Sequence, residues 1–371
     1  MSSAGMSVES ASRERLEKLR LTRTANVGPV AYRQLIARFG TAGAALDALP
    51  DLAARGGTRG VRPADPARVA REMAAVERLG ARHIFLEEAD YPPLLARAEG
   101  SPAVLIARGD AALGAQRSVA IVGARNASAG ACRFARTLGR ALAERGLVVV
   151  SGLARGIDTA AHSGATPART VAVIGCGIDV VFPPENGALQ EAIAEQGLLL
   201  SELPPGAEPL ARHFPARNRI IAWMSAGTVV VEAAPRSGSL LTARLAGKEG
   251  REVMAVPGFP EDPRTQGCNG LIREGATLVQ NADDVIEAIS GIDPRAAMHE
   301  PRRTYAAAPP AGDLEEDARQ RIVGLMSMSA VPVDELVRQS GLPPALVQMA
   351  LLELEIAGRL QRHAGGRVSL L

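Results

Sequence analysis

The sequence has few cysteines, few aromatic residues and no long apolar run. No apolar segment approaches the roughly 20 residues that cross a bilayer, and the polar start MSSAGMSVESASRERLEKLR lacks the apolar core of a secretory signal. We therefore expect a cytoplasmic protein without membrane insertion. The three cysteines, Cys132, Cys176 and Cys268, lie far apart and have no CxxC or histidine pairing, so we expect neither a disulfide framework nor a metal site.

Lysine is nearly absent as well. The formal net charge is only +2, and Lys18 and Lys248 are the only lysines, so arginine carries nearly all of the positive charge. The planar guanidinium suits phosphates and base stacking, but a GC-rich genome would also favour arginine codons over lysine codons. The composition therefore permits a nucleic-acid partner without establishing one.

A length of 371 residues predicts more than one domain. Residues 1–79 carry apolar residues at helical spacing, interrupted at Gly28–Pro29, and predict a small helical domain of the sterile-alpha-motif-like or helix-hairpin-helix-like kind. In a helix-hairpin-helix the backbone amides at a helix N-terminus can hold a phosphate. Simple helix packing is the alternative explanation for the same turn.

Residues 80–290 contain a series of short apolar runs rich in valine, isoleucine and leucine. These runs cover residues 118–123, 147–152, 170–175, 198–202, 228–233 and 252–258. Strands that are buried on both faces lose their polar alternation, and helix-length segments separate these runs. The pattern predicts an α/β fold, namely an extended Rossmann-like, doubly wound and mainly parallel sheet.

The last part of the chain predicts a linker and a third domain. Residues 291–312 are rich in alanine, proline and glycine and show no periodicity, which is typical of a linker. Residues 313–371 contain three helical segments followed by a hairpin around Gly365–Gly366. That order predicts a winged helix-turn-helix domain.

In a doubly wound sheet, ligands bind beyond the carboxyl ends of the strands. Three loops at such ends contain glycine and lead into predicted helices: 123–128, 151–158 and 235–242. Glycine lets backbone amides approach an anion, and a helix N-terminus adds partial positive charge. The loops predict three neighbouring phosphate cradles, although glycine-rich turns also serve tight packing in α/β folds.

Motifs for cofactors and catalysis are missing. No G-x-G-x-x-G follows a strand, and no G-x-x-x-x-G-K-[ST] is present, so no ATP, dinucleotide or other cofactor is expected. The sequence also lacks a G-x-S-x-G elbow, a paired-carboxylate motif and metal-ligand spacing. We therefore predict no catalytic residue and no enzymatic activity.

Arginines surround an aromatic residue in RHFPARNR, residues 212–219. Proteins hold single strands with cations along the backbone and with planar side chains that stack on bases. Phe214 fits that pattern, although it could instead be a core residue. Trp223, in the apolar segment IIAWMSAG, is expected in the core.

Seven motifs in sequence order resemble the DNA-processing protein A (DprA, also called Smf) family. They are SVAIVGARNAS, VVSGLARGIDTAAH, TVAVIGCGIDVVFPPEN, LLLSELPPG, HFPARNRIIAWMS, TVVVEAAPRSGSLLTARLA and REVMAVPG. The resemblance implies a protein that binds and protects incoming single-stranded DNA in natural transformation and assists loading of the RecA recombinase. It also implies a homodimer formed through the central domain.

The loop pattern and the resemblance together predict the DNA-binding residues. These are Gly123, Arg125, Ser151, Gly152, Arg155, Arg212, Phe214, Arg217, Asn218, Arg219, Ser237, Gly238 and Ser239. Two positions depart from the family pattern. Ala124 stands where many relatives have serine or threonine, and Glu185 stands where a basic residue is often found, which puts one edge of the predicted groove in doubt.

Two other functions compete with strand binding. Rossmann-like phosphoribohydrolases, a class of nucleotide-processing enzyme, carry PGGxGTxxE, whereas this chain has PRSGSLLTAR with no acid at the final position. A transcription factor would use the winged helix, but its expected recognition helix, 343–358, contains no arginine or lysine. Arg359, Arg362 and Arg367 in the wing could still contact phosphates, so we expect a partner-binding or weak DNA role there.

Overall fold

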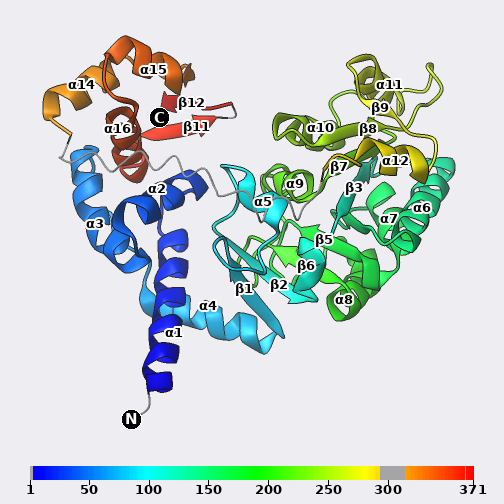
Figure 1. The fold of residues 1–371 in the computed structure, drawn as a ribbon, viewed down its shortest axis with the longest axis horizontal. Coiled ribbons are helices and arrows are strands. Elements are labelled where there is room, and N and C mark those ends of the chain that lie inside the picture. Colours follow the sequence, from blue (N-terminus) through cyan, green and yellow to red (C-terminus); the bar gives the residue numbers. More distant parts are fainter. Residues whose placement is uncertain (1–2, 293–313, 364) are drawn as a thin grey trace. The chain divides into compact units, whose positions relative to one another are not determined.

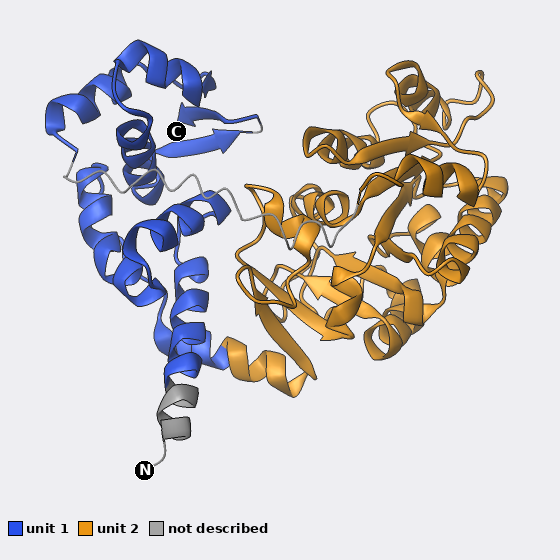
Figure 2. Ribbon diagram, in the orientation of Figure 1, with its two compact units in different colours: residues 1–71, 302–371 blue, residues 72–301 orange. Residues whose placement is uncertain are grey.

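The computed structural model describes residues 3–292, 314–363 and 365–371. The chain forms two compact units, one made of residues 1–71 and 302–371 and the other of residues 72–301 (Figure 2). From residue 293 onward, the predicted linker lies outside the described residues.

The larger unit is built on a nine-stranded sheet with the order β1-β2-β6-β5-β4-β3-β7-β8-β9. Strand β2 pairs with β1 and with β6 in antiparallel orientation, and all other neighbours are parallel. The strands are β1 Ala81–Phe85, β2 Val104–Gly109, β3 Ser118–Gly123, β4 Val148–Ser151, β5 Thr170–Ile174, β6 Leu198–Ser201, β7 Gly227–Val231, β8 Glu252–Ala255 and β9 Thr277–Leu278. Each of the six apolar runs forms a strand, so the predicted fold class is confirmed.

Helices cover both faces of this sheet (Figure 1). On one face lie α6 Ala129–Glu144, α7 Ile157–Ala165, α8 Gly187–Gln196 and α12 Ala282–Ala288. On the other lie α5 Pro93–Arg97, α9 His213–Met224, α10 Gly238–Lys248 and α11 Gln266–Arg273. Burial of alternate strand residues on opposite faces explains why the strands are apolar throughout.

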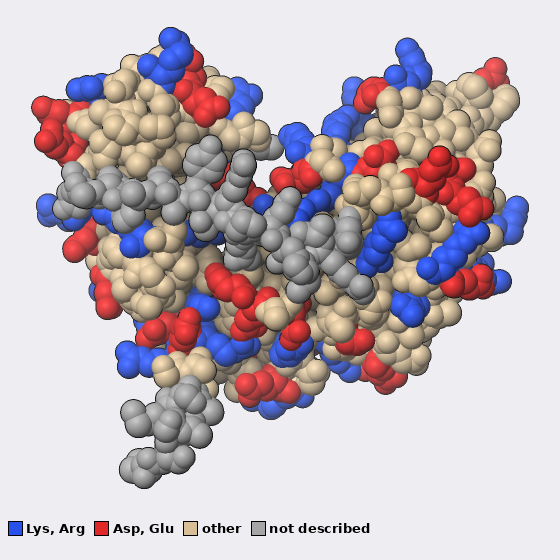
Figure 3. Space-filling model, in the orientation of Figure 1, with Lys and Arg blue, Asp and Glu red and all other residues tan. Residues whose placement is uncertain are grey.

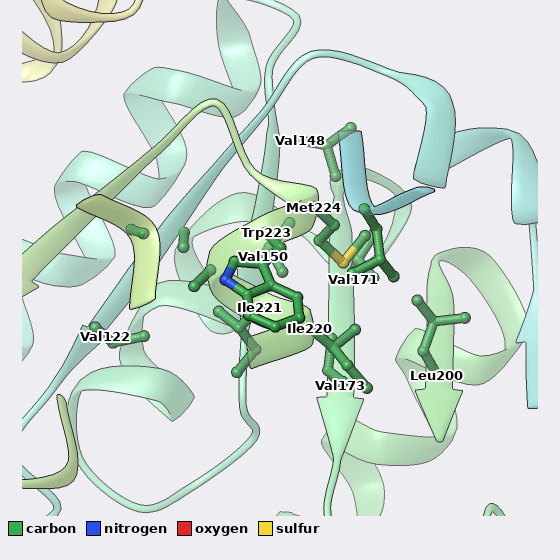
Figure 4. Packing of buried hydrophobic residues seen from close by; sticks show 14 of the residues in the cluster. Val122, Val148, Val150, Val171, Val173, Leu200, Ile220, Ile221, Trp223 and Met224 are labelled. Atoms are coloured by element: carbon green, nitrogen blue, oxygen red, sulfur yellow. The ribbon is translucent and has the colours of Figure 1, made fainter. Parts of the chain in front are cut away.

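Helix α9 anchors the second of these faces. Figure 4 shows its apolar side chains directed toward valines of β4 and β5. Trp223 is 8% exposed, and its Nε1 donates to the carbonyl oxygen of Leu245 at 3.1 Å. The prediction that Trp223 is a core residue is therefore confirmed.

The smaller unit contains the two ends of the chain. Its first part is helical, with α1 Ser3–Arg23, α2 Pro29–Phe39, α3 Ala42–Arg55 and the beginning of α4 Pro66–Arg78. Pro29 begins α2 because a helix leaves its first amides unbonded, so the missing N–H of proline costs nothing there. The side chain of Thr41 caps α3 by accepting from the amide of Ala44 at 3.2 Å.

The second part of this unit is a winged helix, as predicted. It contains α14 Glu316–Gly324, α15 Val333–Ser340, α16 Pro344–Ile356 and a three-stranded sheet of β10 Val331–Pro332, β12 Arg367–Leu370 and β11 Leu360–His363. Gly341 ends α15 in the left-handed conformation, with a φ of 65°. None of the described helices in either unit combines the length and the apolar composition that a membrane span requires.

Candidate nucleic-acid interface

The strand order defines one edge of the sheet as the place for a ligand. From β3 the chain proceeds through β4 and β5 to β6 on one side, and then crosses to β7, β8 and β9 on the other. Ligands of doubly wound sheets bind at the carboxyl ends of the strands where the order reverses, which is here between β3 and β7. The loops 124–128, 152–156, 175–186 and 232–237 begin at these ends.

An exposed arginine and two aromatic rings meet at this edge. The guanidinium carbon of Arg125 lies 5.1 Å from the ring centroid of Phe214. The rings of Phe182 and Phe214 are tilted by 42° with their centroids 5.6 Å apart, and Phe182 is 37% exposed. We name Arg125, Phe182 and Phe214 the aromatic patch. A cation and planar rings side by side are the combination that holds an unpaired base and its phosphate.

Phe214 rests on a glycine that the sheet provides. A Cβ on Gly175, the first residue after β5, would lie 3.3 Å from Cδ1 of Phe214. The ring therefore lies against the backbone at the end of β5. Phe214 as a whole is half-buried. Phe214 is thus not a core residue, in contrast to Trp223 on the same helix.

The loop after β7 offers backbone donors beside the patch. Ser237 is the N-cap residue of α10 but makes no capping hydrogen bond to a described amide, and its Oγ lies 2.7 Å from Oγ of the buried Ser239. A Cβ on Gly238 would meet no described atom within 4 Å. Nδ2 of Asn218 on α9 donates to the carbonyl oxygen of Gly238 at 3.4 Å. This helix N-terminus is therefore accessible to an anion.

The loop after β3 is different because the chain's own carboxylate occupies it. Glu232 Oε2 accepts from the amide of Ser128 at 2.7 Å, and its Oε1 accepts from the Ser128 hydroxyl at 2.5 Å. Ser128 Oγ in turn accepts from the amide of Ala131 and so caps α6. Glu232 is 9% exposed and has a φ of 51°. A carboxylate therefore fills the position where this helix N-terminus would hold a phosphate.

The loop after β4 is filled in the same way. Asp158 Oδ2 accepts from the amides of Gly152 at 3.2 Å and Ala154 at 3.3 Å. Burial raises the pKa of the Asp158 carboxyl, while the positive charge of Arg217 acts in the opposite direction. Burial lowers the pKa of the Arg217 guanidinium to about 10, so it stays protonated at neutral pH. Two of the three predicted cradles thus hold an internal carboxylate.

Two of the residues predicted to bind DNA form hydrogen bonds within the protein instead. Ser151 is fully buried, and its hydroxyl donates to the carbonyl oxygen of Ile121 at 2.6 Å. Arg217 is 6% exposed and donates from Nη1 to the carbonyl oxygen of Val173 at 2.7 Å. In this conformation neither side chain can reach a bound DNA strand, because each is enclosed between the sheet and the helices. Both position the loops around them.

Packing accounts for two of the predicted glycines. A Cβ on Gly152 would lie 1.7 Å from Nη1 of Arg217, so only glycine leaves room for that guanidinium. A Cβ on Gly123 would lie 1.9 Å from the carbonyl oxygen of Val231 on the neighbouring strand. The close approach that we expected to a phosphate is here an approach to the protein itself.

Two further predicted arginines are paired with carboxylates. Arg219 binds both oxygens of Glu202 at 2.6 and 2.7 Å and is largely buried. Arg155 is exposed and forms an ion pair with Glu185, which is also exposed. The hydrogen bond from Arg155 lowers the pKa of the Glu185 carboxyl. The charge of Arg155 at this edge is therefore partly neutralised by Glu185, the residue at which the sequence departs from the family pattern.

The predicted residues that remain on the surface are Arg125, Arg155, Arg212, Phe214, Asn218, Ser237 and Gly238, with Phe214, Asn218 and Ser237 partly buried. Phe182 was not among the predicted residues, although it lies in the motif VVFPPEN after β5. Its position directly after Val180 and Val181 was the available signal. On the face shown in Figure 3, basic and acidic side chains are interspersed over both units. The described side chains on that face form no broad field of one sign.

The fold and this edge define a Rossmann-like protein that presents a guanidinium, aromatic rings and accessible amides where such sheets bind ligands. Among the described residues, no group of three or more His, Cys, Asp or Glu side chains is arranged to hold a metal ion. The predicted absence of a cofactor stays a prediction.

Comparison with known proteins identifies the family. Residues 82–290 match the model of DNA recombination-mediator protein A, residues 12–75 match the DprA-like N-terminal HHH domain, and residues 306–366 match the DprA winged helix domain. Protein Smf of Escherichia coli is 37% identical over 289 residues, which cover 76% of this chain and 75% of that protein. The chain therefore belongs to the DNA recombination-mediator protein A (DprA/Smf) family.

Solved structures similar to this chain include two of DNA processing protein A. DNA processing protein A of Streptococcus pneumoniae matches with a TM-score of 0.60 and 36% identity, covering 73% of this chain and 95% of that one. DNA processing protein A of Helicobacter pylori matches with a TM-score of 0.51 and 32% identity, covering 56% of this chain and 96% of that one. The structure of the Helicobacter pylori protein is described as revealing a unique mode of single-stranded DNA binding.

Proposed function

We propose that this chain binds single-stranded DNA at the carboxyl edge of its large sheet. The observation that carries the proposal is the aromatic patch, in which Arg125 lies over Phe214 and Phe182 lies beside it. The N-terminus of α10, with Ser237 and Gly238, supplies amides to a neighbouring phosphate. Unpaired bases would stack on the rings while Arg125 and this helix N-terminus contact the backbone.

Duplex DNA is a poorer fit to the same surface. Its bases are stacked on one another inside the double helix, so rings at a protein edge reach them only where the strands separate. The single-stranded DNA binding of the Helicobacter pylori relative agrees with this preference. We therefore expect the chain to discriminate in favour of the single strand.

The proposal includes the absence of catalysis. A nucleotide-processing enzyme on this fold needs anion sites at the strand ends, and Glu232 and Asp158 occupy the amides of two of those loops. Burial lowers the pKa of His162 to about 3 and raises the pKa of Cys176 to about 11. A neutral, enclosed histidine and a protonated thiol make poor catalytic groups at neutral pH.

Family membership supports the wider role. We propose that the chain acts in the cytoplasm as a recombination mediator that protects incoming single-stranded DNA during natural transformation. In this role it would assist loading of the RecA recombinase and work as a homodimer through the larger unit. These functions rest on the family and not on any contact in the described residues.

The test is fluorescence anisotropy of a labelled oligonucleotide, as a single strand and as the matching duplex, titrated at several salt concentrations. We expect preference for the single strand and an affinity that falls steeply with salt, because phosphate contacts release counterions. Equal binding of both forms would contradict the proposal. Release of a free base from a nucleoside monophosphate would favour the phosphoribohydrolase-like alternative.

A further inference from the structure

The third helix of the winged helix, α16, is buried on nearly every side. Eight of its residues are buried: Val347, Met349, Ala350, Leu351, Leu352, Glu353, Leu354 and Ile356. Only one side of a helix can face the core of its own small domain. The remaining buried residues need a second covering surface, since a helix that is apolar all round is an internal helix.

The N-terminal helical domain provides that surface. Helix α16 packs against α2 and α3 within the same compact unit (Figure 1). Nε2 of Gln34 on α2 donates to Oε1 of Gln348 on α16 at 2.9 Å. The hydroxyl of Thr58 donates to the carbonyl oxygen of Ala357 at 2.8 Å, and Arg359 Nη1 donates to that of Gly56 at 2.9 Å. The contact thus combines apolar burial with hydrogen bonds made in both directions.

A glycine of the helical domain is fitted to this contact. A Cβ on Gly56 would lie 2.1 Å from the carbonyl oxygen of Glu353, in the last turn of α16. Gly56 itself has a φ of −69°, which any residue adopts without strain. The backbone of the helical domain therefore does not require glycine at this position, but the approach of α16 does.

The arginines of the winged helix are engaged within the protein. All six arginines between residues 314 and 371 donate to a described acceptor: Arg319 to Glu353, Arg321 to Ser340, Arg338 to Glu335, Arg359 to Gly56, Arg362 to Glu355 and Arg367 to Ala330. A DNA-reading winged helix instead directs basic side chains from its third helix and wing at the duplex.

We propose that α16 is a docking helix whose partner is the N-terminal helical domain of the same chain. The surface by which other winged helices enter a major groove is covered by this domain, and the two chain ends form one cooperative unit. The winged helix is therefore available to a partner only through its remaining surfaces, and it does not read DNA with α16.

Chemical cross-linking tests the contact in the full-length protein. Gln34→Cys with Gln348→Cys places one thiol on α2 and one on α16 at positions whose native side chains hydrogen-bond, in a background with Cys132→Ser because Cys176 and Cys268 are buried. A short bis-maleimide spans the gap that the two shorter side chains leave, and we expect rapid intramolecular cross-linking, seen as a faster-migrating monomer on a denaturing gel. The matched control pairs Gln34→Cys with Gln320→Cys, since Gln320 bonds to Glu316 of its own helix α14, and should cross-link slowly.

Gly56→Ala tests the fit. Its Cβ collides with α16 and with nothing that the helical domain needs, so we expect the Gln34–Gln348 cross-link to form at least about tenfold more slowly, equivalent to about 1.4 kcal/mol of docking free energy. Gly324→Ala is the control, because a Cβ there would meet no described atom within 4 Å. An unchanged far-ultraviolet circular dichroism spectrum verifies that the Gly56→Ala protein keeps its helices.

Two results would overturn the proposal. One is equal cross-linking rates in the Gly56→Ala and Gly324→Ala backgrounds, which would mean that the contact does not hold α16. The other is a cross-link found only between two copies, as a dimer on the gel, which would identify a second chain as the occupant.

Discussion

The guanidinium of Arg125 lies over the ring of Phe214, with 5.1 Å between the guanidinium carbon and the ring centroid. The two residues come from different parts of the chain, Arg125 from the loop after β3 and Phe214 from the first turn of α9. Their pairing places one positive charge and one planar ring within reach of the same nucleotide. We expect Arg125 to contact the phosphate and Phe214 to stack on the base.

Arg125→Ala should weaken single-strand binding equally for all sequences. Arg125 is expected to contact phosphate and not a base edge, so its loss should also reduce the slope of log affinity against log salt by about 0.7. Anisotropy titrations at four or more salt concentrations measure the slope. Arg140→Ala, an exposed arginine near the C-terminal end of α6, is the control. An unchanged slope for Arg125→Ala would argue against a phosphate contact.

Phe214→Ala should weaken binding with little change in the salt slope. Loss of one stacked base costs roughly 1 to 3 kcal/mol, or about 5- to 150-fold in affinity. Phe39→Ala is a matched control, because Arg38 lies over the Phe39 ring at 5.5 Å in the smaller unit, to which no strand contact is assigned. Phe182→Ala should lower the single-strand affinity by a smaller factor than Phe214→Ala does. Equal affinities of Phe214→Ala and Phe39→Ala would rule out stacking.

Glu185→Gln should tighten single-strand binding severalfold. The ion pair with Arg155 neutralises a guanidinium at the edge of the site, and the substitution releases it to a phosphate. The double variant Arg155→Ala with Glu185→Gln separates this effect from simple removal of a negative charge. If the double variant gains as much relative to Arg155→Ala as Glu185→Gln gains relative to the unmodified protein, the ion pair is not the cause.

Strand positions and the winged helix could be predicted because they depend on local pattern. Apolar runs such as 170–175 form strands buried on both faces, whereas β1 was missed because Arg82 and His83 interrupt its apolar character. Two residues of the aromatic patch, Arg125 and Phe214, could also be predicted from motif and loop position, whereas the third, Phe182, was missed.

What could not be predicted is which loops already hold an anion. Glu232 reaches Ser128 from 104 residues along the chain, and Arg217 of α9 lies against Gly152 in the loop after β4. No local pattern reveals that a carboxylate just after another strand binds the N-cap residue of a helix, or that an arginine in a basic segment points inward. These contacts exist only in the folded sheet. Tertiary packing, and not residue type, therefore decides that Arg125 is exposed and Arg217 is buried.

Deletion of residues 313–371 should leave single-strand affinity within about tenfold, or about 1.4 kcal/mol. The proposed contacts lie in the larger unit, and the arginines of the winged helix are bonded within the smaller one. The same deletion uncovers the surface of α2 and α3 that α16 buries, so the truncated protein should self-associate more readily. Anisotropy and light scattering measure the two effects, and a larger loss of affinity would assign the winged helix to the DNA site.

His162 is enclosed in the larger unit in its neutral form. Its Nδ1 lies 2.7 Å from the hydroxyl of Thr170, and that hydroxyl donates to the carbonyl oxygen of Val149. The histidine must therefore donate from Nδ1, which leaves Nε2 unprotonated. Nε2 is buried and has no hydrogen-bond partner among the described residues. Burial, with the Arg217 charge as the second cause, lowers the pKa of His162 to about 3.

This neutral histidine predicts an acid-sensitive fold. Between about pH 6.5 and pH 3 the unfolded chain binds a proton at His162 that the folded chain does not, so stability falls as the pH falls through that range. The loss between pH 7 and pH 4 should be about 3 kcal/mol. His162→Gln removes this titration, so the stability difference between the two proteins should shrink by that amount on acidification. Urea unfolding at each pH, followed by the fluorescence of the single tryptophan Trp223 in the larger unit, measures it. A difference that stays constant with pH would mean that His162 takes up its proton at the same pH in the folded protein as in the unfolded chain.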